Sequence, residues 1–391
     1  MRDVVVVSVA RTPVGSFQGA LADKSAPELG AIAIKEALSR ARVDGKDVSE
    51  VIMGEVLQGG VGQAPARQAA LKAGLPTSVP CLTVNKVCGS GLKAVMLARQ
   101  AIALGDADVV VAGGMESMSN APFILPTARN GMRMGNQTVV DLMLHDGLWD
   151  PYGNAAMGNF GDRCAKEHDF TRESQDAFAK TSYERAIAAQ KAGHFKGEIV
   201  PVVIAGKKGD VVVENDEEPS KYNPEKMPTL RPAFNKDGTV TAANASKIND
   251  GAAALVLMSS DEAKRRGLAP LATLVADGTF AQAPEWFTTA PTGAIQRALE
   301  RAKLKASDVD LYEINEAFSV VTQITMRDLA IPHDKVNVWG GAVALGHPIG
   351  ASGARVFITL LSALAQQKKS IGCASLCIGG GEAVAVIAKR G

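Results

Sequence analysis

An α/β fold built from two similar halves is the fold class that the sequence predicts, and two observations support it. The first is that short runs rich in β-branched residues alternate with stretches whose apolar residues recur at helical spacing. The strand-like runs span residues 4–7, 109–112, 271–275 and 383–387, and the helical stretches include residues 29–41 and 92–103. Such alternation is typical of a sheet covered by helices.

The second observation is an internal repeat. Residues 47–55 (DVSEVIMGE) resemble residues 308–316 (DVDLYEINE). Three further pairs recur in the same order: Ala26-Pro27 with Ala290-Pro291, Gly89-Ser90-Gly91 with Ala351-Ser352-Gly353, and Ala112-Gly113-Gly114 with Ile378-Gly379-Gly380. We therefore expect a duplicated half. Residues 1–119 with 246–268 form the first copy, residues 269–391 form the second, and residues 120–245 form an inserted loop domain.

Composition narrows the class of protein. The 391 residues are 46% hydrophobic, which is enough for more than one core. A balance of 42 basic against 41 acidic residues gives no general charge to attract nucleic acid or a membrane surface. The early charges Arg2 and Asp3 exclude a secretory signal, and we expect no apolar run to span a bilayer. Five cysteines in a chain of this length indicate reduced thiols, so we expect a cytoplasmic protein.

Cys88 is the first residue whose setting suggests chemistry. It lies in the segment 85–91 (NKVCGSG), directly before a predicted helix. The free N–H groups and the positive dipole end of a helix start stabilise a thiolate, and glycine neighbours let a substrate approach closely. A lone cysteine is more often an inert core residue, so this segment alone leaves both interpretations open.

His347 lies in a glycine-rich segment, residues 341–353, where Pro348 directs its backbone away from helix just before a helix start. The repeat places this helix start opposite that of Cys88. If the halves pack about a pseudo-twofold axis, the imidazole reaches the thiol and takes its proton.

Cys377 ends a predicted strand and precedes Gly379-Gly380-Gly381, a turn that favours glycine. Exposed N–H groups in such a turn bind an oxyanion. Cys373 does not form a zinc pair with Cys377, because the spacing is not that of a zinc knuckle and no second Cys or His pair accompanies it. We expect no metal site.

Asn315 and Glu316 begin the segment 315–318 (NEAF), where a predicted strand gives way to a helix. Taken alone, they are interpreted as capping residues. Beside Cys88, His347 and Cys377, an amide that positions a water or an acyl oxygen is the better account.

These segments together resemble the thiolase family from end to end: Asn-x-x-Cys-x-Ser-Gly, Asn-Glu-Ala-Phe, Gly-His-Pro-x-Gly and Cys-x-Gly-Gly-Gly, with residues 244–251 (NASKINDG). The resemblance implies two five-stranded halves layered α-β-α-β-α, a loop domain, and a homodimer or homotetramer. It also implies cofactor-free acyl transfer, with Cys88 as the nucleophile activated by His347 and Cys377 moving the α-proton. One implied oxyanion site uses His347 and a water held by Asn315, and the other uses the N–H groups of Cys88 and Gly379.

The resemblance also places the CoA substrate. The pantetheine tunnel is expected at Leu148, Met157, Phe234, Ala242, Ser246, Phe287, Ala317 and Phe318, and the phosphates at Lys207, Lys208, Lys221 or Arg231. The histidine that usually borders the thioester is Ala156 here, which implies a roomier or less polar acyl pocket, whereas Phe287 is similar to fungal and mitochondrial members. Some members bind potassium beside the CoA site. The tyrosine that helps them is Pro219 here, with Tyr222 nearby, so the ion remains open.

Three functions are compatible with these patterns. The first is condensation of two acetyl-CoA to acetoacetyl-CoA through an acyl-Cys88 intermediate, together with its reverse. The second is a broader 3-ketoacyl-CoA thiolase for longer or branched chains, which Ala156 favours. The third, from another class, is a non-catalytic acyl-CoA-binding protein, which the retained reactive residues disfavour.

Overall fold

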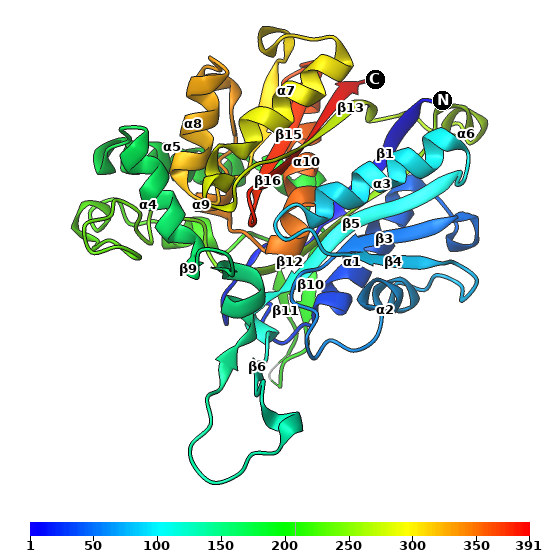
Figure 1. Ribbon diagram of the computed structural model, residues 1–391. Coiled ribbons are helices and arrows are strands. Elements are labelled where there is room, and N and C mark those ends of the chain that lie inside the picture. The colour runs from blue at the N-terminus through cyan, green and yellow to red at the C-terminus, as the bar shows by residue number, and fades with distance from the viewer. Residues whose placement is uncertain (208) are drawn as a thin grey trace.

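A ten-stranded sheet runs through the computed structural model, which describes residues 1–207 and 209–391. The strands lie in the order β14-β15-β16-β13-β1-β12-β5-β3-β4, and the short β2 pairs with β12 (Figure 1). Their bounds are β1 (Val4–Arg11), β2 (Gly15–Ser16), β3 (Glu50–Gly54), β4 (Cys81–Val84), β5 (Val109–Ser117), β12 (Asn249–Ser259), β13 (Ala272–Ala281), β14 (Leu311–Ile314), β15 (Ile371–Ile378) and β16 (Glu382–Arg390). All residues of β1, β5 and β12 are buried, so these strands carry near-continuous apolar runs instead of alternating ones.

The predicted duplication is confirmed by the strand pairing. In the first half, β1–β12 and β12–β5 are antiparallel, whereas β5–β3 and β3–β4 are parallel. In the second half, β13–β16 and β16–β15 are antiparallel and β15–β14 is parallel. The halves join where β1 pairs with β13 over Val5↔Thr273 and Val6↔Ala272. The repeat at residues 47–55 and 308–316 gives β3 and β14, each preceded by a one-turn 3-10 helix.

Two details of the repeat differ from expectation. The second half has four strands instead of five, because the counterpart of β4 is reduced to a single bridge between Tyr312 and Val336. The similarity of segments 112–114 and 378–380 is not structural. Gly113 and Gly114 lie inside β5, where any side chain would meet backbone, whereas Gly380 and Gly381 form a turn at positive φ after β15.

Helices cover the outer face of each half of the sheet, and two further helices lie between the halves. Their bounds are α1 (Ala26–Ala41), α2 (Pro65–Lys72), α3 (Ser90–Leu104), α4 (Met157–Glu167), α5 (Arg172–Ala192), α6 (Ser260–Arg265), α7 (Ala290–Ala302), α8 (Ser319–Asp328), α9 (Ala342–Leu345) and α10 (Ile349–Gln366). Helix α1 packs on β1, β5 and β12, and α7 packs on β13, β15 and β16. Helices α3 and α10 lie between the two halves and contact strands of both, which gives the predicted α-β-α-β-α layering.

The central helices correct one expectation. The windows Val87–Leu104 and Ile349–Gln366 are long and apolar enough to cross a bilayer by composition, although no such run was expected. The second window is 83% buried inside the protein, and both helices contribute to the largest core cluster. Their apolar surfaces therefore face other parts of this chain.

Close backbone contact fixes how α3 and α10 cross. A Cβ on Gly353 would lie 2.2 Å from the Leu92 nitrogen, and a Cβ on Gly91 would lie 2.8 Å from the Ala354 nitrogen. Both helices begin at this crossing, so the residues just before them, Cys88 and His347, are brought to the same place.

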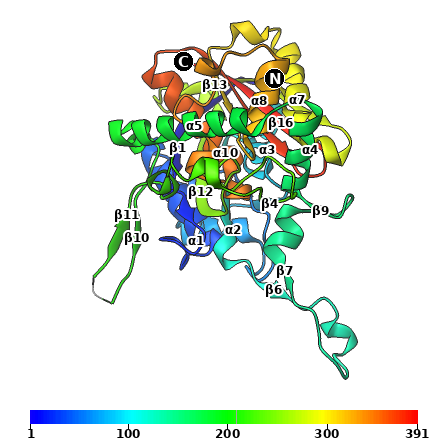
Figure 2. The same cartoon turned by 90° about the vertical axis from the view of Figure 1, so that its left-hand side faces the viewer.

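The segment between β5 and β12 lies outside the sheet and contains α4, α5 and three hairpins: β6 (Phe123–Ile124) with β7 (Val140–Asp141), β8 (Trp149–Asp150) with β9 (Ala155–Ala156), and β10 (Val202–Ile204) with β11 (Val211–Val213). Figure 2 shows the β6–β7 arm and the β10–β11 hairpin projecting from the body of the molecule. Helix α5 lies against α8 and α9. The domain limits at residues 119, 245 and 268 remain our proposal.

Candidate active site

A small cavity brings the three predicted reactive side chains together. Its volume is about 50 Å³, and it lies where the starts of α3, α4 and α10 meet the end of β15. The lining residues are Val87, Cys88, Gly147, Leu148, Met157, Ser246, Phe287, Ala317, Phe318, His347, Ile349, Cys377 and Gly379. Most of them are apolar, so a reaction inside this cavity proceeds largely away from water.

The turn between β4 and α3 presents Cys88. Val87 takes a positive φ of 45°, which is strained for a β-branched residue. The Asn85 side chain accepts the Val87 N–H at 3.0 Å, and the Ser90 hydroxyl accepts the Lys86 N–H at 2.8 Å while donating to the Val87 carbonyl at 2.7 Å. The Asn and Ser of this segment therefore hold the strained turn that carries the thiol.

The ionisation of Cys88 differs from the sequence expectation. Burial raises the pKa of the Cys88 thiol to about 12, and hydrogen bonds from the N–H groups of Gly379 and Cys88 itself only partly oppose this effect. The helix start therefore does not by itself produce a resting thiolate, because desolvation outweighs it. Cys88 needs a base.

His347 supplies an unprotonated nitrogen. Its backbone N–H donates to the Asn249 side chain at 2.9 Å, and its Nδ1 lies 2.6 Å from the Ser352 hydroxyl. With that hydroxyl assigned as the donor to the Pro348 carbonyl at 2.9 Å, Nδ1 is the protonated nitrogen and Nε2 carries the lone pair. Burial and the positive charge of Arg355 lower the pKa of His347 to about 3, which keeps the imidazole neutral.

Cys377 is the second thiol at the site. It lies at the end of β15, paired with Ala383 of β16 and followed by the turn at Gly379 to Gly381. Burial and the neighbouring Cys88 raise its pKa well above the ordinary value. Gly380 and Gly381 have φ values of 89° and 86°, a conformation that favours glycine, and this turn aims the Gly379 N–H at the Cys88 sulfur.

Asn315 and Glu316 have separate surroundings. The Asn315 side-chain nitrogen lies 3.4 Å from His347 Nε2, and within the described residues its side-chain oxygen has no hydrogen-bond partner. Glu316 instead accepts hydrogen bonds from Ser182, Asn337 and the Val343 N–H. The amide therefore faces the reactive histidine, whereas the carboxylate holds α5 and α9 in place. Neither residue is the N-cap of α8, which is Phe318.

Most of the expected pantetheine residues meet at the cavity. Leu148, Met157, Ser246, Phe287, Ala317 and Phe318 line it. Phe234 packs edge-on against Phe318 with ring centroids 6.1 Å apart, which places it beside the lining. Ala242 is exposed and is not part of the lining.

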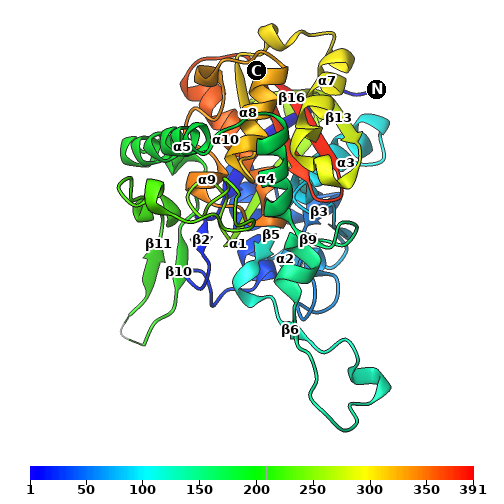
Figure 3. The ribbon, with the colours of Figure 1, turned by 60° about the vertical axis from the view of Figure 1, so that its left-hand side comes forward.

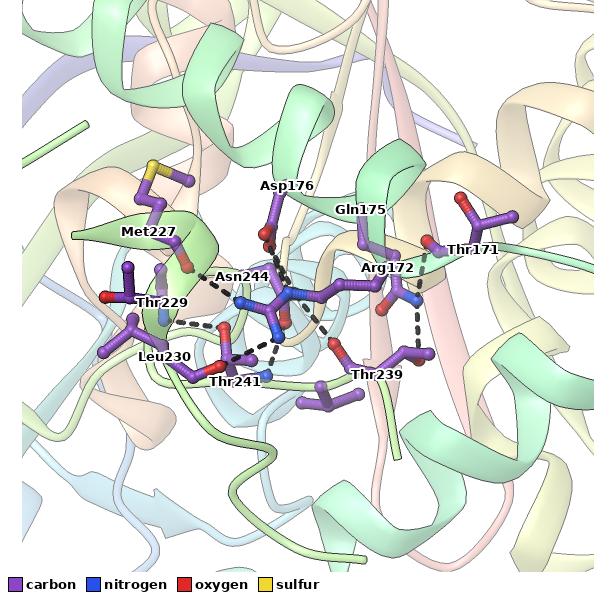
Figure 4. A network of polar contacts seen from close by, with 12 residues as sticks. Thr171, Arg172, Gln175, Asp176, Met227, Thr229, Leu230, Thr239, Thr241 and Asn244 are labelled. Atoms are coloured by element: carbon purple, nitrogen blue, oxygen red, sulfur yellow. Dashed lines mark hydrogen bonds and ion pairs between the residues drawn. The ribbon is translucent and has the colours of Figure 1, made fainter. Parts of the chain in front are cut away.

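A polar network fixes the loop that carries Ala242 and Ser246 (Figure 4). Arg172 donates to Asp176 at 2.7 Å and to the Met227 and Leu230 carbonyls at 2.8 and 3.0 Å. Asp176 in turn accepts from the Asn244 side chain at 2.8 Å. Helix α5 thereby anchors both ends of the segment from Met227 to Asn244.

The basic residues expected near a phosphate have different surroundings among the described residues. Lys207 is exposed in the turn of the β10–β11 hairpin, and Arg231 is exposed in the following loop. The Lys221 ammonium is already bonded to Ser16 and Glu218. Lys208 lies outside the described residues.

Several residues that hold the site were not singled out as functional from the sequence. Ser352 was noted only as part of the repeat, and Asn249 only within residues 244–251. Glu116 accepts the N–H groups of Val56, Leu57 and Gly350 and so fixes the start of α10. Their place in the sequence could have identified them. Ser352 and Asn249 lie inside motif segments, and Glu116 follows two glycines in β5.

A duplicated α/β fold with a Cys, a His and a second Cys at a shared apolar cavity defines an enzyme of the thiol-dependent acyl-transfer class. The model of the thiolase N-terminal domain matches residues 4–261, and that of the C-terminal domain matches residues 268–390. This chain belongs to the thiolase family. It is 54% identical to acetyl-CoA acetyltransferase 2 of Arabidopsis thaliana (99% of this chain, 96% of the relative) and to acetyl-CoA acetyltransferase of Cupriavidus necator (100% of both). The Schizosaccharomyces pombe acetyl-CoA acetyltransferase is 51% identical over 99% of both chains.

Proposed function

We propose that this protein is an acetyl-CoA C-acetyltransferase, which joins two acetyl-CoA to acetoacetyl-CoA plus CoA and catalyses the reverse thiolysis. The observation that carries the proposal is the shared cavity of Cys88, His347 and Cys377, with the Gly379 N–H directed at the Cys88 sulfur. Relatives named acetyl-CoA acetyltransferase at 50–54% identity over nearly the whole chain support it.

The first step is transfer of the acyl group to Cys88. With a neutral thiol and a neutral imidazole at rest, His347 Nε2 takes the thiol proton as the sulfur attacks the thioester carbon. The negative charge that develops on the thioester oxygen is stabilised by the N–H groups of Cys88 and Gly379. The C–S bond to CoA breaks, and the departing CoA sulfur receives the proton held by His347.

The second step forms the carbon–carbon bond. His347 Nε2 first takes the Cys377 thiol proton, and the resulting thiolate takes an α-proton from a second acetyl-CoA. The enolate oxygen is held by the Nε2–H of His347 and a water on Asn315. The α-carbon attacks the acyl carbon on Cys88, the C–Sγ bond breaks, and acetoacetyl-CoA leaves. The α-proton stays on Cys377, and the proton held by His347 passes to the Cys88 sulfur, so both thiols and the neutral imidazole are restored and no cofactor is needed.

The size and lining of the cavity favour a short acyl chain. A volume of about 50 Å³ holds a group of a few heavy atoms, and Phe287 packs edge-on against Phe160 and Phe318 at one wall. The alternative, a broader 3-ketoacyl-CoA thiolase, rests on Ala156, a small side chain at the start of α4 beside Met157. We further propose that the protein works in the cytoplasm as a homodimer or homotetramer.

The test compares CoA-dependent cleavage of acetoacetyl-CoA with that of 3-ketohexanoyl-CoA, and intact mass locates the acyl group. Acetyl-CoA should label Cys88, and Cys88→Ala should abolish the label. Cys377→Ala should still be labelled at Cys88 but should not condense, because only the carbon-bond step uses the second thiol. Comparable activity on the six-carbon substrate would favour the broader thiolase, and no activity with no adduct would favour an acyl-CoA-binding protein.

A further inference from the structure

Lys247 lies between two segments of the site, and the proposed reaction does not use it. Its ammonium group donates to the Ala245 carbonyl at 2.7 Å and to the Val343 carbonyl at 3.3 Å. Ala245 precedes Ser246, which lines the cavity, and Val343 belongs to α9, which leads to His347. The Lys247 side chain thus joins the loop that carries Ser246 to the segment that carries His347.

The surroundings of this ammonium suit a fixed positive charge. The carboxylates of Glu218 and Glu316 favour its charged form, against a burial that lowers its pKa to about 8. The ammonium lies 5.6 Å from the centre of the Tyr183 ring, which stacks on Tyr222 at 4.7 Å. The cation therefore has carbonyl oxygens, carboxylates and an aromatic face around it.

Three elements from distant parts of the chain meet at this point. Helix α9 packs against α5, which carries Tyr183, and against the 3-10 helix Glu218–Lys221. Figure 3 shows α9 beside α5. The loop at residues 245–247 is itself tied to the site, because the Ser246 N–H donates to the Ala317 carbonyl at 2.9 Å.

The same oxygen atoms would suit a potassium ion, which is bound in proteins by backbone carbonyl groups. The residues present do not fit a free ion here. The Lys247 ammonium already bonds the Ala245 and Val343 carbonyls. A second monovalent cation at this place would be repelled by the first.

We propose that Lys247 is a built-in monovalent cation, which positions Ser246 against the His347 segment and makes the enzyme independent of potassium. Lys247 is a positioning residue, since it holds carbonyl groups and not the substrate. The KM measurements that test this proposal rest on the function proposed above, whereas the thermal midpoints in different salts do not.

The first arm of the test uses the unaltered protein. Its thermal midpoint and its KM for acetoacetyl-CoA should be the same in potassium, sodium or choline chloride at equal ionic strength. A saturable rise in midpoint or activity that is specific to potassium would overturn the proposal, and the midpoint answers this question even if the protein has no thiolase activity.

The second arm uses variants. Lys247→Ala leaves room for a small ion, so KM should rise roughly tenfold or more in choline, with little change in kcat, and potassium or ammonium should restore it and raise the midpoint. Lys247→Met fills the same space without charge, so its KM should rise and no ion should restore it. Lys226→Ala removes an exposed lysine from the neighbouring inserted segment and should change neither value.

Two results would contradict the proposal. One is Lys247→Ala with the KM of the unaltered protein in choline. The other is equal effects of potassium on the Ala and Met variants, because the ion would then act elsewhere.

Discussion

Single side chains set the resting protonation of the site. His347 is neutral because it is buried near Arg355, and Ser352 determines which of its nitrogens is free. Cys88 and Cys377 are neutral because burial disfavours their thiolates. In the proposed reaction, these residues therefore exchange protons among themselves instead of starting as ions.

Removing the Ser352 hydroxyl should slow acylation. In Ser352→Ala, His347 Nδ1 loses its acceptor and both tautomers become populated, so we expect kcat/KM to fall about tenfold to hundredfold with CoA binding unchanged. Single-turnover labelling of Cys88 measures the rate. Ser375→Ala is the control, because this buried hydroxyl also donates to a backbone carbonyl, that of Val384, and should leave the rate unchanged. An equal loss in both variants would contradict the role of Ser352.

The pH dependence of acylation follows from the pKa of His347. With that pKa lowered to about 3, the imidazole stays unprotonated throughout the neutral range. Acylation should therefore show no acid limb near the ordinary histidine pKa of about 6.5, and its rate should be level between about pH 5 and pH 8. Rapid-quench labelling of Cys88 checks this expectation, and a limb centred near pH 6.5 would refute it.

At the scale of elements, the crossing of α3 and α10 decides where the reactive residues meet. Both helices start at the crossing, and glycine at positions 91 and 353 lets their backbones touch. Gly89 has a similar purpose, because a Cβ there would lie 2.4 Å from Ile378, which leads to the Gly379 turn. Close backbone packing thus explains the glycines at positions 91 and 353.

A methyl group at the crossing should push the two helix starts apart. Gly353→Ala places Cβ against the Leu92 backbone, so we expect a loss of about 1–3 kcal/mol in the free energy of unfolding and a larger fractional loss of acylation. Urea unfolding and Cys88 labelling measure the two effects. Gly197→Ala is the control, since nothing lies within 4 Å of its Cβ. A fully active and stable Gly353→Ala would contradict this account.

Glu55 is a buried acidic residue directly after β3. It is buried, and within the described residues neither carboxylate oxygen has a hydrogen-bond partner. Burial and the nearby Glu116 raise the pKa of Glu55 to about 9. The folded state holds its proton while the unfolded chain releases it above about pH 4.5, so stability is lost as the pH rises from there toward 9.

Glu55→Gln should therefore stabilise the protein at pH 8 and have little effect at pH 5. The neutral amide removes the cost of keeping a buried carboxyl group protonated, for which we expect about 1–3 kcal/mol. Thermal unfolding at both pH values measures the difference. Glu36→Gln, at a partly exposed ion pair on α1, serves as the control and should show no such dependence on pH. A destabilised Glu55→Gln at pH 8 would show that the carboxylate is needed.

At the scale of the whole molecule, the β6–β7 arm has surface that this chain does not cover. Phe123, Met132, Met134 and Val139 are all more than half exposed there. Exposed apolar side chains gathered on one projection mark an interaction surface. A second copy of the chain is the partner that the proposed homo-oligomer requires.

Charges on this arm should reduce the assembly. We expect the double variant Phe123→Glu with Met134→Glu to form a smaller oligomer by native mass spectrometry, because a carboxylate is costly at an apolar interface. Labelling of Cys88 should persist, since the cavity lies outside the arm. Leu104→Glu, on an exposed apolar residue at the end of α3, is the control. An unchanged mass for the double variant would exclude the arm from assembly.

Sequence patterns alone were sufficient to predict the fold class and the duplication, and they singled out Cys88, His347 and Cys377, which the structure brings to one cavity. Strands and helices follow from apolar spacing along the chain, and the repeat placed Cys88 and His347 at matching helix starts. The expected match of residues 112–114 with 378–380 was wrong in detail. Glycine serves close packing inside a strand in the first segment and a turn in the second.

The protonation and the surroundings of those residues depend on how the chain folds. The tertiary structure raised the pKa of Cys88 by burying it, selected the His347 tautomer through Ser352, and placed the Lys247 ammonium between two distant carbonyl groups. It also showed that the apolar lengths of α3 and α10 belong to a core between two layers. These properties could not be predicted from the sequence, because solvation and charge depend on neighbours in space, most of which lie far away along the chain.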